Sequence, residues 1–381
     1  MYIKTRTVRL YPNSHMTKEL DKLCDYRRYC WNLGLETWNE MYESHLLDKD
    51  NNPSPSWRKV RDLLVEQKQD WQYALSARVL QQGISDLGNA WKHFFDKSLP
   101  DWGKPKFKSK KAPRQGFKSD RIKFIKGKLR LDKPRENKSV WYDIRLKGNL
   151  LDYDYGTVSI YRVDNKYYAS IPYKVSEIED KPNKPKTSSN TAVDVNVGHL
   201  NYTDGSCDVL PKRLAKLYNR IKHYQKMLAR KQPGSINYQE VRTKLQRDYT
   251  KVTNLQHDII HKFTTSLVEN YDTIVIEDLD VKHMQMSHVA SKGLQRAQFG
   301  YFRQLLQYKC EWYGKNLILA DRFYPSTQRC SVCGFVKQGD DRITLQGNKK
   351  HHTKHNEYIC YNCGVILDRD ENAVQNLLQL I

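Results

Sequence analysis

Two cysteine pairs near the end of the chain constrain its fold more than any other feature. The first reads Cys330-Ser-Val-Cys333 and the second Cys360-Tyr-Asn-Cys363. Two C-x-x-C pairs are typical of a tetrahedral structural zinc site, which stabilises a local fold that has little apolar core. The 26 residues between the pairs exceed the usual spacing of about 15 to 20 and include three histidines that could replace a cysteine: His351, His352 and His355. Four thiolates leave no open position, so we expect a structural metal.

A short acidic segment directly follows the second cysteine pair. It reads Leu367-Asp-Arg-Asp370-Glu-Asn-Ala373, and the apolar residues after it predict a final helix with Asp370 in its first turn. A zinc site joined to a carboxylate at a helix start is rarer than either feature alone. The combination suggests a metal-dependent nuclease that carries a structural zinc insert.

The charge of the chain predicts a polyanionic partner. Its 381 residues are enough for two or three domains, and 65 Lys and Arg against 43 Asp and Glu give a formal net charge of +22. A polyanion would neutralise this self-repulsion, and 25 Tyr with 8 Trp offer flat surfaces on which bases stack. Nucleic acid is therefore the expected partner.

Membrane attachment and secretion fit the sequence less well. The first residues contain no apolar signal core, and no run of about 18 apolar residues occurs. Four cysteines are scattered singly, so we expect them to stay reduced and to pack in the interior: Cys24, Cys30, Cys207 and Cys310. These features predict a cytoplasmic protein without a membrane partner.

The N-terminal part predicts one strand, then helices, then more strands. Residues 5–11 alternate polar with apolar side chains, which predicts a half-buried strand with Arg6 and Arg9 on one face. Helical spacing runs from 14 to 97, with a break at 51–56. Strands are predicted at 122–125, 128–131, 141–145, 156–162 and 167–173, with a hairpin turn at 163–166. We expect an antiparallel sheet or small barrel that includes the first strand.

A basic tract separates these helices from the strands. Residues 104–128 contain eleven Lys or Arg and a single acid, Asp120. A solvated linker is one interpretation, but the tract runs directly into strands, which favours contact with phosphate. The expected nucleic-acid contacts are Lys104, Lys106, Lys108, Lys110 and Lys111, together with Arg6 and Arg9.

The C-terminal part predicts an α/β domain. The segment 176–190 has two prolines and no periodicity, and it predicts the main domain boundary. Strands at 191–197 and 200–203 follow, with a turn at Asp204-Gly205 and then long helices at 214–231 and 238–270. A strand, a helix and a strand at 273–276, 296–313 and 317–320 complete the alternation. The basic face of the first long helix offers a further surface for phosphate.

Three carboxylates lie where an α/β sheet gathers its active site. Asp194 and Glu277 interrupt or end β-branched runs typical of buried parallel strands, where a carboxylate is costly unless it is paired or binds a cation. With Asp370 they would bind two Mg²⁺ ions roughly 4 Å apart, which activate water and stabilise the leaving oxygen in phosphodiester cleavage. Each acid alone is equally compatible with a cap or salt bridge. Three neighbouring acids are not expected to be ligands: Asp278, Asp280 and Asp368.

Several motifs together resemble the TnpB family, RNA-guided nucleases of bacterial insertion sequences and apparent ancestors of type V CRISPR effectors. They are Val193-Asp-Val-Asn-Val-Gly198, Thr273-Ile-Val-Ile-Glu-Asp-Leu279, Glu311-Trp-Tyr-Gly314, Tyr324-Pro-Ser326 and Asp368-Arg-Asp-Glu-Asn-Ala373. The likeness is strong from about residue 191 onward and weaker before it. The chain departs from many relatives at Asn196, where they have Gly, and at Ala373-Val374, where Ala-Ala is commoner. Neither change removes a ligand.

The resemblance implies a multidomain fold that combines α/β and α+β parts. A wedge β-barrel (1–13 and 103–176) would be interrupted by a helical recognition lobe (14–102). A linker (177–190) would lead to an RNase H-like RuvC nuclease domain (191–325 and 364–381) that holds a zinc ribbon (326–363). The matching motifs make Asp194, Glu277 and Asp370 the catalytic triad with two Mg²⁺, and Cys330, Cys333, Cys360 and Cys363 the Zn²⁺ ligands. Contacts to a DNA motif would come from Ser76, Gln81 and Gln82.

The implied activity is RNA-guided cleavage of double-stranded DNA by a prokaryotic, monomeric ribonucleoprotein. The guide RNA would derive from the end of the element, and a short transposon-adjacent motif would be recognised. Base pairing would read the target, so the protein would need mostly backbone contacts. The alternatives are an RNA-guided repressor that does not cut, a small type V CRISPR effector, and a transposase that joins DNA ends. The intact triad argues against the repressor, and the family likeness argues against the transposase.

Overall fold

The computed structural model describes residues 2–98, 102–132, 143–148, 154–175, 187–279, 293, 296–344, 346–348 and 350–381. The chain divides into two compact units, Met1–Asp180 and Lys181–Ile381. The division falls inside the segment 176–190, where the sequence predicts a boundary. Within the described ranges, no helix is both long and apolar enough to cross a membrane.

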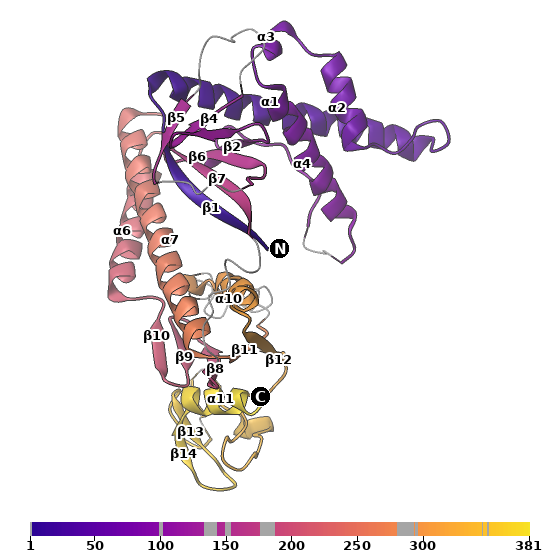
Figure 1. Ribbon diagram of the computed structural model, residues 1–381. Helices are drawn as coiled ribbons and strands as arrows, with labels where there is room; N and C mark the ends of the chain where they lie inside the picture. Colours follow the sequence, from indigo (N-terminus) through magenta and orange to yellow (C-terminus); the bar gives the residue numbers. More distant parts are fainter. Residues whose placement is uncertain are drawn as a thin grey trace. The chain divides into compact units, whose positions relative to one another are not determined.

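The first unit contains a seven-stranded antiparallel sheet (Figure 1). The strand order is β2-β6-β7-β1-β5-β4-β3, so the first strand of the chain belongs to this sheet, as the sequence predicts, and lies at its centre. Positive φ angles of 50° and 59° at Asp164 and Asn165 close the β6–β7 hairpin in the turn predicted there. The strands are β1 (Tyr2–Tyr11), β2 (Arg114–Ser119), β3 (Lys123–Ile125), β4 (Lys128–Arg130), β5 (Asp143–Leu146), β6 (Val158–Val163) and β7 (Lys166–Val175).

β2 lies inside the basic tract, where the sequence does not predict a strand. Its side chains alternate between buried and accessible positions, with Gln115, Phe117 and Ser119 buried. Phe117 is the only large apolar residue of the three, so hydrophobic alternation does not reveal the strand. The tract is therefore part strand and part extended segment.

The prediction that Arg6 and Arg9 share one face of the first strand is wrong. Side chains alternate along a strand with a period of two, so residues three apart point to opposite faces. Arg6 has the same parity as the buried Val8 and Leu10, although its own side chain is exposed. Arg9 lies on the other face, where its guanidinium is 5.0 Å from the centroid of the Tyr11 ring.

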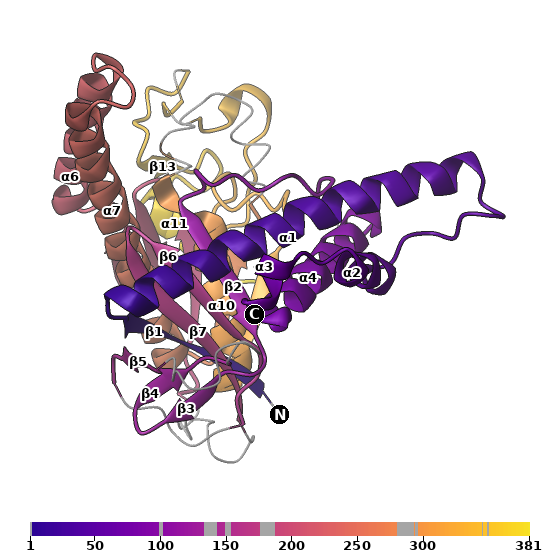
Figure 2. The same cartoon turned by 90° about the horizontal axis from the view of Figure 1, so that it is seen from above.

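Four helices lie within the described residues of the first unit, and the break predicted at 51–56 separates the first two. Figure 2 shows α1 crossing the strands of this sheet and continuing beside α4. There the rings of Trp38 and Trp91 stack with centroids 5.7 Å apart, and Gly34 lies where a Cβ atom would come within 2.4 Å of Ile84. A larger residue at position 34 would therefore force the terminal methyl group of Ile84 to move. The helices are α1 (Ser14–Leu47), α2 (Trp57–Glu66), α3 (Asp70–Tyr73) and α4 (Ala77–Phe95).

The second unit contains a five-stranded mixed sheet of order β10-β9-β8-β11-β12. β8, β11 and β12 run parallel, whereas β8, β9 and β10 pair antiparallel. β10 is not predicted from the sequence; its pairing of Gly205 with Tyr202 shifts the turn to Thr203 and Asp204. The strands are β8 (Asn190–Val195), β9 (His199–Tyr202), β10 (Gly205–Asp208), β11 (Thr273–Glu277) and β12 (Asn316–Ala320).

Helices cover both faces of this sheet, which explains why its central strands are apolar without alternation (Figure 1). One face packs against α7 and α10 through residues that include Val193, Ile274 and Ile276. The other face packs against α11 through Ala192 and Val275. The described helices are α6 (Lys212–Ala229), α7 (Ile236–Asn270), α10 (Phe299–Tyr313) and α11 (Arg369–Leu378). The first three lie within three residues of their predicted bounds, and α11 is the predicted final helix with Asp370 in its first turn.

The cysteine pairs lie in an insert between β12 and α11. The insert contains a 3₁₀ turn, η1 (Gly339–Asp341), and a two-stranded ribbon of β13 (Glu357–Ile359) and β14 (Ile366–Asp368). Its small core includes Ile343, Tyr358 and two of the cysteines. β14 runs directly into α11, so the insert and the last helix are continuous.

Candidate functional site

Asp194 and Glu277 lie at the same end of two neighbouring parallel strands. Val193 of β8 lies opposite Ile276 of β11, so the next residues, Asp194 and Glu277, occupy equivalent positions on strands about 5 Å apart. Because side chains alternate, both carboxylates point to the face that carries Ala192 and Val275, which α11 covers. The register thus brings together two acids that are 83 residues apart in the sequence.

Asp370 reaches this face from the first turn of α11. The helix begins at Arg369, and Asp368 caps it by accepting hydrogen bonds from the backbone N–H groups of Asp370 and Glu371 at 2.9 and 3.2 Å. Asp368 is therefore the N-cap of this helix. Its carboxylate binds the helix backbone, while the charge of Asp370 acts on Asp194.

The carboxylates oppose one another's ionisation. Asp194 is only 3% exposed, and its pKa is raised by burial first and by the charges of Glu277 and Asp370 next. Burial also raises the pKa of Glu277. In the part of the chain that the structure describes, neither Asp194 nor Glu277 forms an ion pair with a basic side chain. A divalent cation would supply the missing charge, so the donor set fits Mg²⁺.

Polar side chains hold the first two carboxylates in place. The Asn196 amide donates to Oδ2 of Asp194 at 2.6 Å, and the Ser326 hydroxyl donates to Oε1 of Glu277 at 2.6 Å. The Asn196 side chain thus contacts the buried acid directly. Each donor leaves oxygen lone pairs of its carboxylate available to a cation.

Asp370 has three polar neighbours. The Asn201 amide donates to its Oδ2 at 2.9 Å, Nε2 of His199 lies 3.3 Å from the same oxygen, and the Arg369 guanidinium lies 3.3 Å from Oδ1. His199 and Asn201 are not predicted as site residues from the sequence. The alternation of side chains along β9 could have identified them. Leu200 is buried on the face covered by α7 and α10, so its neighbours His199 and Asn201 point to the opposite face, and Asn201 pairs with Asp194 across the β8–β9 ladder.

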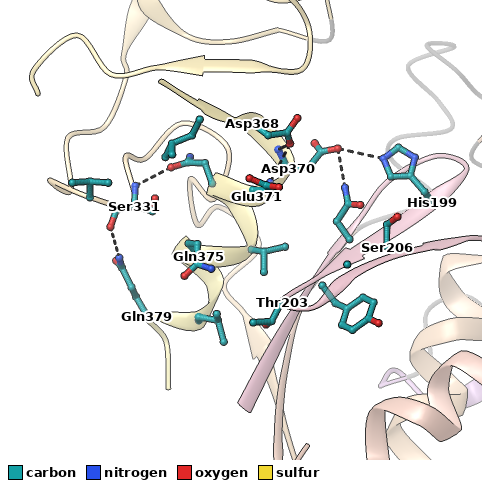
Figure 3. A pocket seen from close by; sticks show the side chains of 17 residues that line it. His199, Thr203, Ser206, Ser331, Asp368, Asp370, Glu371, Gln375 and Gln379 are labelled. Carbon is teal, nitrogen blue, oxygen red and sulfur yellow. Dashed lines mark hydrogen bonds and ion pairs between the residues drawn. The ribbon is translucent and has the colours of Figure 1, made fainter. Parts of the chain in front are cut away.

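A cavity of about 970 Å³ opens beside Asp370 (Figure 3). Its walls come from α11, from the β9–β10 hairpin, and from Ser331 and Val332, which lie between Cys330 and Cys333. Figure 3 shows His199 and Asp370 facing each other across one end. His199 is the only basic residue among those that line it. An anionic phosphate would therefore need a bound cation to approach Asp370 from this side.

Two buried asparagines of α11 join the helix to the first cysteine pair. The Asn372 side chain donates to the Arg329 carbonyl at 2.7 Å and accepts from the Ser331 N–H at 2.9 Å. The Asn376 amide donates to the carbonyls of Ser326 and Arg329 at 2.8 and 2.6 Å. Since the Ser326 hydroxyl also donates to Glu277, these hydrogen bonds link the insert to the carboxylate site.

The four cysteines form a compact cluster. Their Sγ atoms all lie within 4.8 Å of one another, with 3.8 Å between Cys330 and Cys363 and 3.5 Å between Cys333 and Cys360. Tetrahedral zinc with bonds of about 2.3 Å to sulfur requires sulfur separations of about 3.8 Å. The cluster therefore has the donors and the spacing that Zn²⁺ needs.

Both cysteine pairs have the same local fold. The carbonyls of Cys330 and Cys360 accept from the N–H groups of Gly334 and Gly364 at 2.9 and 3.0 Å. These glycines have φ angles of 76° and 74°, a conformation that disfavours other residues. The repeated C-x-x-C-G sequence thus builds two matching knuckles.

The histidines of the insert do not join the cysteine cluster in the described structure. His351 lies 2.8 Å from Asp341 and stacks on Tyr361. Asp278 is also engaged elsewhere, because it forms ion pairs with Arg303 and Arg322. Asp280 lies outside the described residues.

The basic segment before β2 is bound to α1 and is not a free linker. The Trp31 indole donates to the Lys106 carbonyl at 3.0 Å, and the Asn32 side chain pairs with both backbone groups of Lys108 at 3.1 and 2.7 Å. The Lys108 ammonium lies 3.6 Å from the centroid of the Trp31 ring. The segment presents five exposed lysines on a held backbone: Lys104, Lys106, Lys108, Lys110 and Lys111.

The recognition-helix candidates differ in accessibility. Ser76 is buried, caps α4 by accepting from the Arg78 N–H at 3.2 Å, and binds Asp132. The predicted DNA contact of Ser76 does not fit this structural role. Gln81 and Gln82 are half-buried, and Gln81 accepts from Arg78 at 2.8 Å.

Three family models match successive parts of the chain. Residues 1–46 match one described as a helix-turn-helix domain, residues 170–288 match the OrfB_IS605 model, described as "Probable transposase", and residues 299–377 match the "Cas12f1-like, TNB domain". In the structure, residues 2–46 form β1 and most of the single helix α1, so the first name does not describe their fold.

Curated relatives and a solved structure extend the likeness to the whole chain. A Streptomyces pristinaespiralis protein named "Putative RNA-guided DNA endonuclease" is 28% identical over 97% of this chain and 87% of its own length. The "TnpB-like protein L79" of Acanthamoeba polyphaga mimivirus is 31% identical over 36% of this chain and 25% of its own. Cas12f1 from its complex with sgRNA and target DNA has a similar fold, with a TM-score of 0.52, 12% identity, and coverage of 99% and 98% of the two chains.

Proposed function

The chain belongs to the TnpB family, and we infer that it is an RNA-guided DNA endonuclease. We propose that Asp194, Glu277 and Asp370 are its catalytic residues and bind two Mg²⁺ ions. The observation that carries this proposal is their convergence on one face of the second sheet, where burial and mutual repulsion raise the pKa of Asp194. Partners of this enzyme would be a guide RNA and double-stranded DNA next to a short adjacent motif.

The domain assignment follows from the same family. The first unit would contain the wedge barrel (1–13 and 103–176) and the helical recognition lobe (14–102). The second would be a RuvC domain (191–325 and 364–381) with the zinc ribbon (326–363). An antiparallel β8–β9–β10 hairpin set beside parallel β11 and β12, with helices on both faces, supports an RNase H-like nuclease.

Bound Mg²⁺ would activate water for attack on the phosphodiester and stabilise the leaving oxygen. The chain's own residues would position the ligands for this chemistry. Asn196 and Ser326 fix one oxygen each of Asp194 and Glu277, while Asn201 and Arg369 hold the two oxygens of Asp370. These bonds set the side-chain orientations before a metal binds, so little ordering remains to be done when the site is loaded.

Zn²⁺ would be structural in this protein. Four sulfur donors at tetrahedral spacing leave no open coordination position, so the ion would neither bind substrate nor activate water. The ion would affect cleavage indirectly, through the hydrogen bonds of Asn372, Asn376 and Ser326 that join the insert to α11 and Glu277.

The net charge of +22 fits a protein that binds the backbones of two nucleic acids. The exposed lysines held along α1 would contact phosphate there, and Gln81 and Gln82 remain candidates for the adjacent motif. We expect the ribonucleoprotein to be monomeric and to act in the prokaryotic cytoplasm.

A cleavage assay with guide RNA and matched DNA tests the assignment. Asp194→Asn and Asp370→Asn should still bind the guide RNA but should lose DNA cleavage, as should the wild-type protein with Mg²⁺ chelated. Glu371→Gln is the matched control, because Glu371 is an exposed carboxylate in the same turn of α11. Cleavage by either Asn variant at the wild-type rate would refute the site. Guide-dependent binding without cleavage by the wild-type protein would instead favour the repressor, and joined DNA products would favour a transposase.

A further inference from the structure

Lys337 carries a buried ammonium group that has no hydrogen-bond partner. Its side chain is 1% exposed, and Nζ makes no hydrogen bond within the described residues. The residue follows the first cysteine knuckle, where its backbone N–H donates to the Gln328 carbonyl at 3.1 Å. An ammonium removed from water without hydrogen bonds is strongly destabilising, so something else must compensate it.

Two tyrosine rings lie next to this ammonium. Nζ is 4.4 Å from the centroid of the Tyr358 ring and 4.0 Å from that of Tyr361, within the range of cation–π attraction. These tyrosines flank Cys360 in the sequence, so the rings that contact the ammonium belong to the second cysteine pair. The position of Lys337 is therefore tied to the metal cluster.

The remaining anionic neighbours are the cysteines and Asp341. Desolvation lowers the pKa of Lys337, while the charges of Cys360, Asp341 and Cys330 oppose that change. Asp341 is already paired, with Lys350 at 2.9 Å and His351 at 2.8 Å. Apart from Asp341, which already has these two cationic partners, the anions whose charge acts on Lys337 are the cysteines.

Metal binding would create the charge that Lys337 lacks. Zn²⁺ held by four thiolates has a net charge of −2, and the protons that the thiols still carry leave as the metal binds. A buried cation stabilises this dianion more than it stabilises the less negatively charged metal-free cluster, so it favours the loaded state. The effect depends on charge and not on the volume of the side chain.

We propose that Lys337 is the buried counter-charge of the four-cysteine centre and that it strengthens zinc retention. The inference rests on the zinc site assigned to the cysteines under the proposed function. Lys337 is a positioning residue, because it acts on the metal through the electrostatics of the thiolates and contacts no substrate.

Zinc release from the full-length protein tests the proposal. Metal content of the purified wild-type protein is measured first, and release is then followed with a metallochromic chelator in excess. Lys337→Met keeps the length of the side chain without its charge and should release zinc about tenfold faster or more, the size of effect that loss of an outer-shell partner has. Lys337→Arg restores a cation and should release zinc at nearly the wild-type rate. Tyr361→Phe keeps the ring and removes a buried hydroxyl that has no partner, so it should not accelerate release.

The outcomes separate the proposal from its premise. A wild-type protein without bound zinc would refute the zinc site itself. One zinc per chain with unchanged release from Lys337→Met would refute the counter-charge, as would equal acceleration in Lys337→Met and Lys337→Arg, since packing would then explain both. If Lys337→Met does not fold, ¹⁵N spectra of lysine side chains in the zinc-loaded wild type decide. They should contain one ammonium signal protected from solvent exchange that is absent in Lys337→Arg, and a missing signal would overturn the proposal.

Discussion

Asn372 and Asn376 of α11 bind the first cysteine pair through a shared acceptor, and their replacement should cost more together than separately. Asn376→Leu removes the donor to the Ser326 carbonyl, and Asn372→Leu removes the acceptor of the Ser331 N–H. Leaving one buried polar group unpaired costs about 1–3 kcal/mol. The cost of Asn376→Leu should lie near the lower end of this range, because the substitution also removes a buried Oδ1 that has no partner among the described residues.

The double variant has an additional cost. Both asparagines donate to the carbonyl of Arg329, at 2.7 and 2.6 Å, so each single variant leaves that carbonyl one donor. Removing both leaves a third, partly buried group without these donors. We therefore expect a coupling energy of about 1–2 kcal/mol beyond the sum of the single effects.

Denaturant-induced zinc release gives a local measurement of this coupling. Global unfolding of a chain with two units is not a two-state process, whereas release of the ion reports the opening of the insert. Gln379→Ala is the matched control, because its amide donates to the Ser331 carbonyl at 2.9 Å but is exposed, so water replaces it at a cost within about 0.5 kcal/mol. Additive single effects, within about 0.5 kcal/mol, would refute the shared-acceptor argument.

Three further predictions concern the carboxylates and the basic segment. A carboxylate whose folded pKa is raised stabilises the fold fully below its unfolded pKa, near 4, and loses that contribution as the pH rises. In metal-free protein, Asp194→Asn should therefore raise the melting temperature more at pH 8 than at pH 4, and equal increments measured by calorimetry would contradict this sign. Asn201→Leu should raise the Mg²⁺ concentration for half-maximal cleavage by roughly tenfold without changing guide RNA affinity; an unchanged Mg²⁺ requirement would show that Asn201 does not position Asp370. Replacing Lys106, Lys110 and Lys111 with Ala should reduce the slope of log affinity against log salt for nucleic acid by roughly two to three, and binding titrations with the wild-type slope would place these lysines away from phosphate.

The sequence predicts the features of this fold that depend on local pattern. Continuous apolar runs predict the central strands of the second sheet, and helical spacing predicts α6 and α7 within two residues of their bounds. The β6–β7 turn follows from Asp164 and Asn165, which tolerate positive φ. In each case the decisive interaction lies within a few residues of the chain.

The sequence-based predictions fail where local pattern is weak or misapplied. β2 has a single large apolar side chain, so only its pairing with β6 identifies it as a strand. Arg6 and Arg9 are three residues apart, so the period of two along a strand puts them on opposite faces and not on the one face predicted. Ser76 is a polar residue of the kind that contacts DNA, but it is buried and its hydroxyl caps α4.

Residue chemistry at fixed spacing determines, without a structure, that four cysteines can bind one metal and that three acids need a cation if they are buried. Only the tertiary structure decides which residues complete these sites. Ser326 donates to Glu277, Asn201 donates to Asp370, and the Lys337 ammonium lies next to the rings of Tyr358 and Tyr361, although these partners are far apart in the chain. Such contacts depend on strand register and helix packing, which the whole core sets, and a short sequence motif contains no record of them.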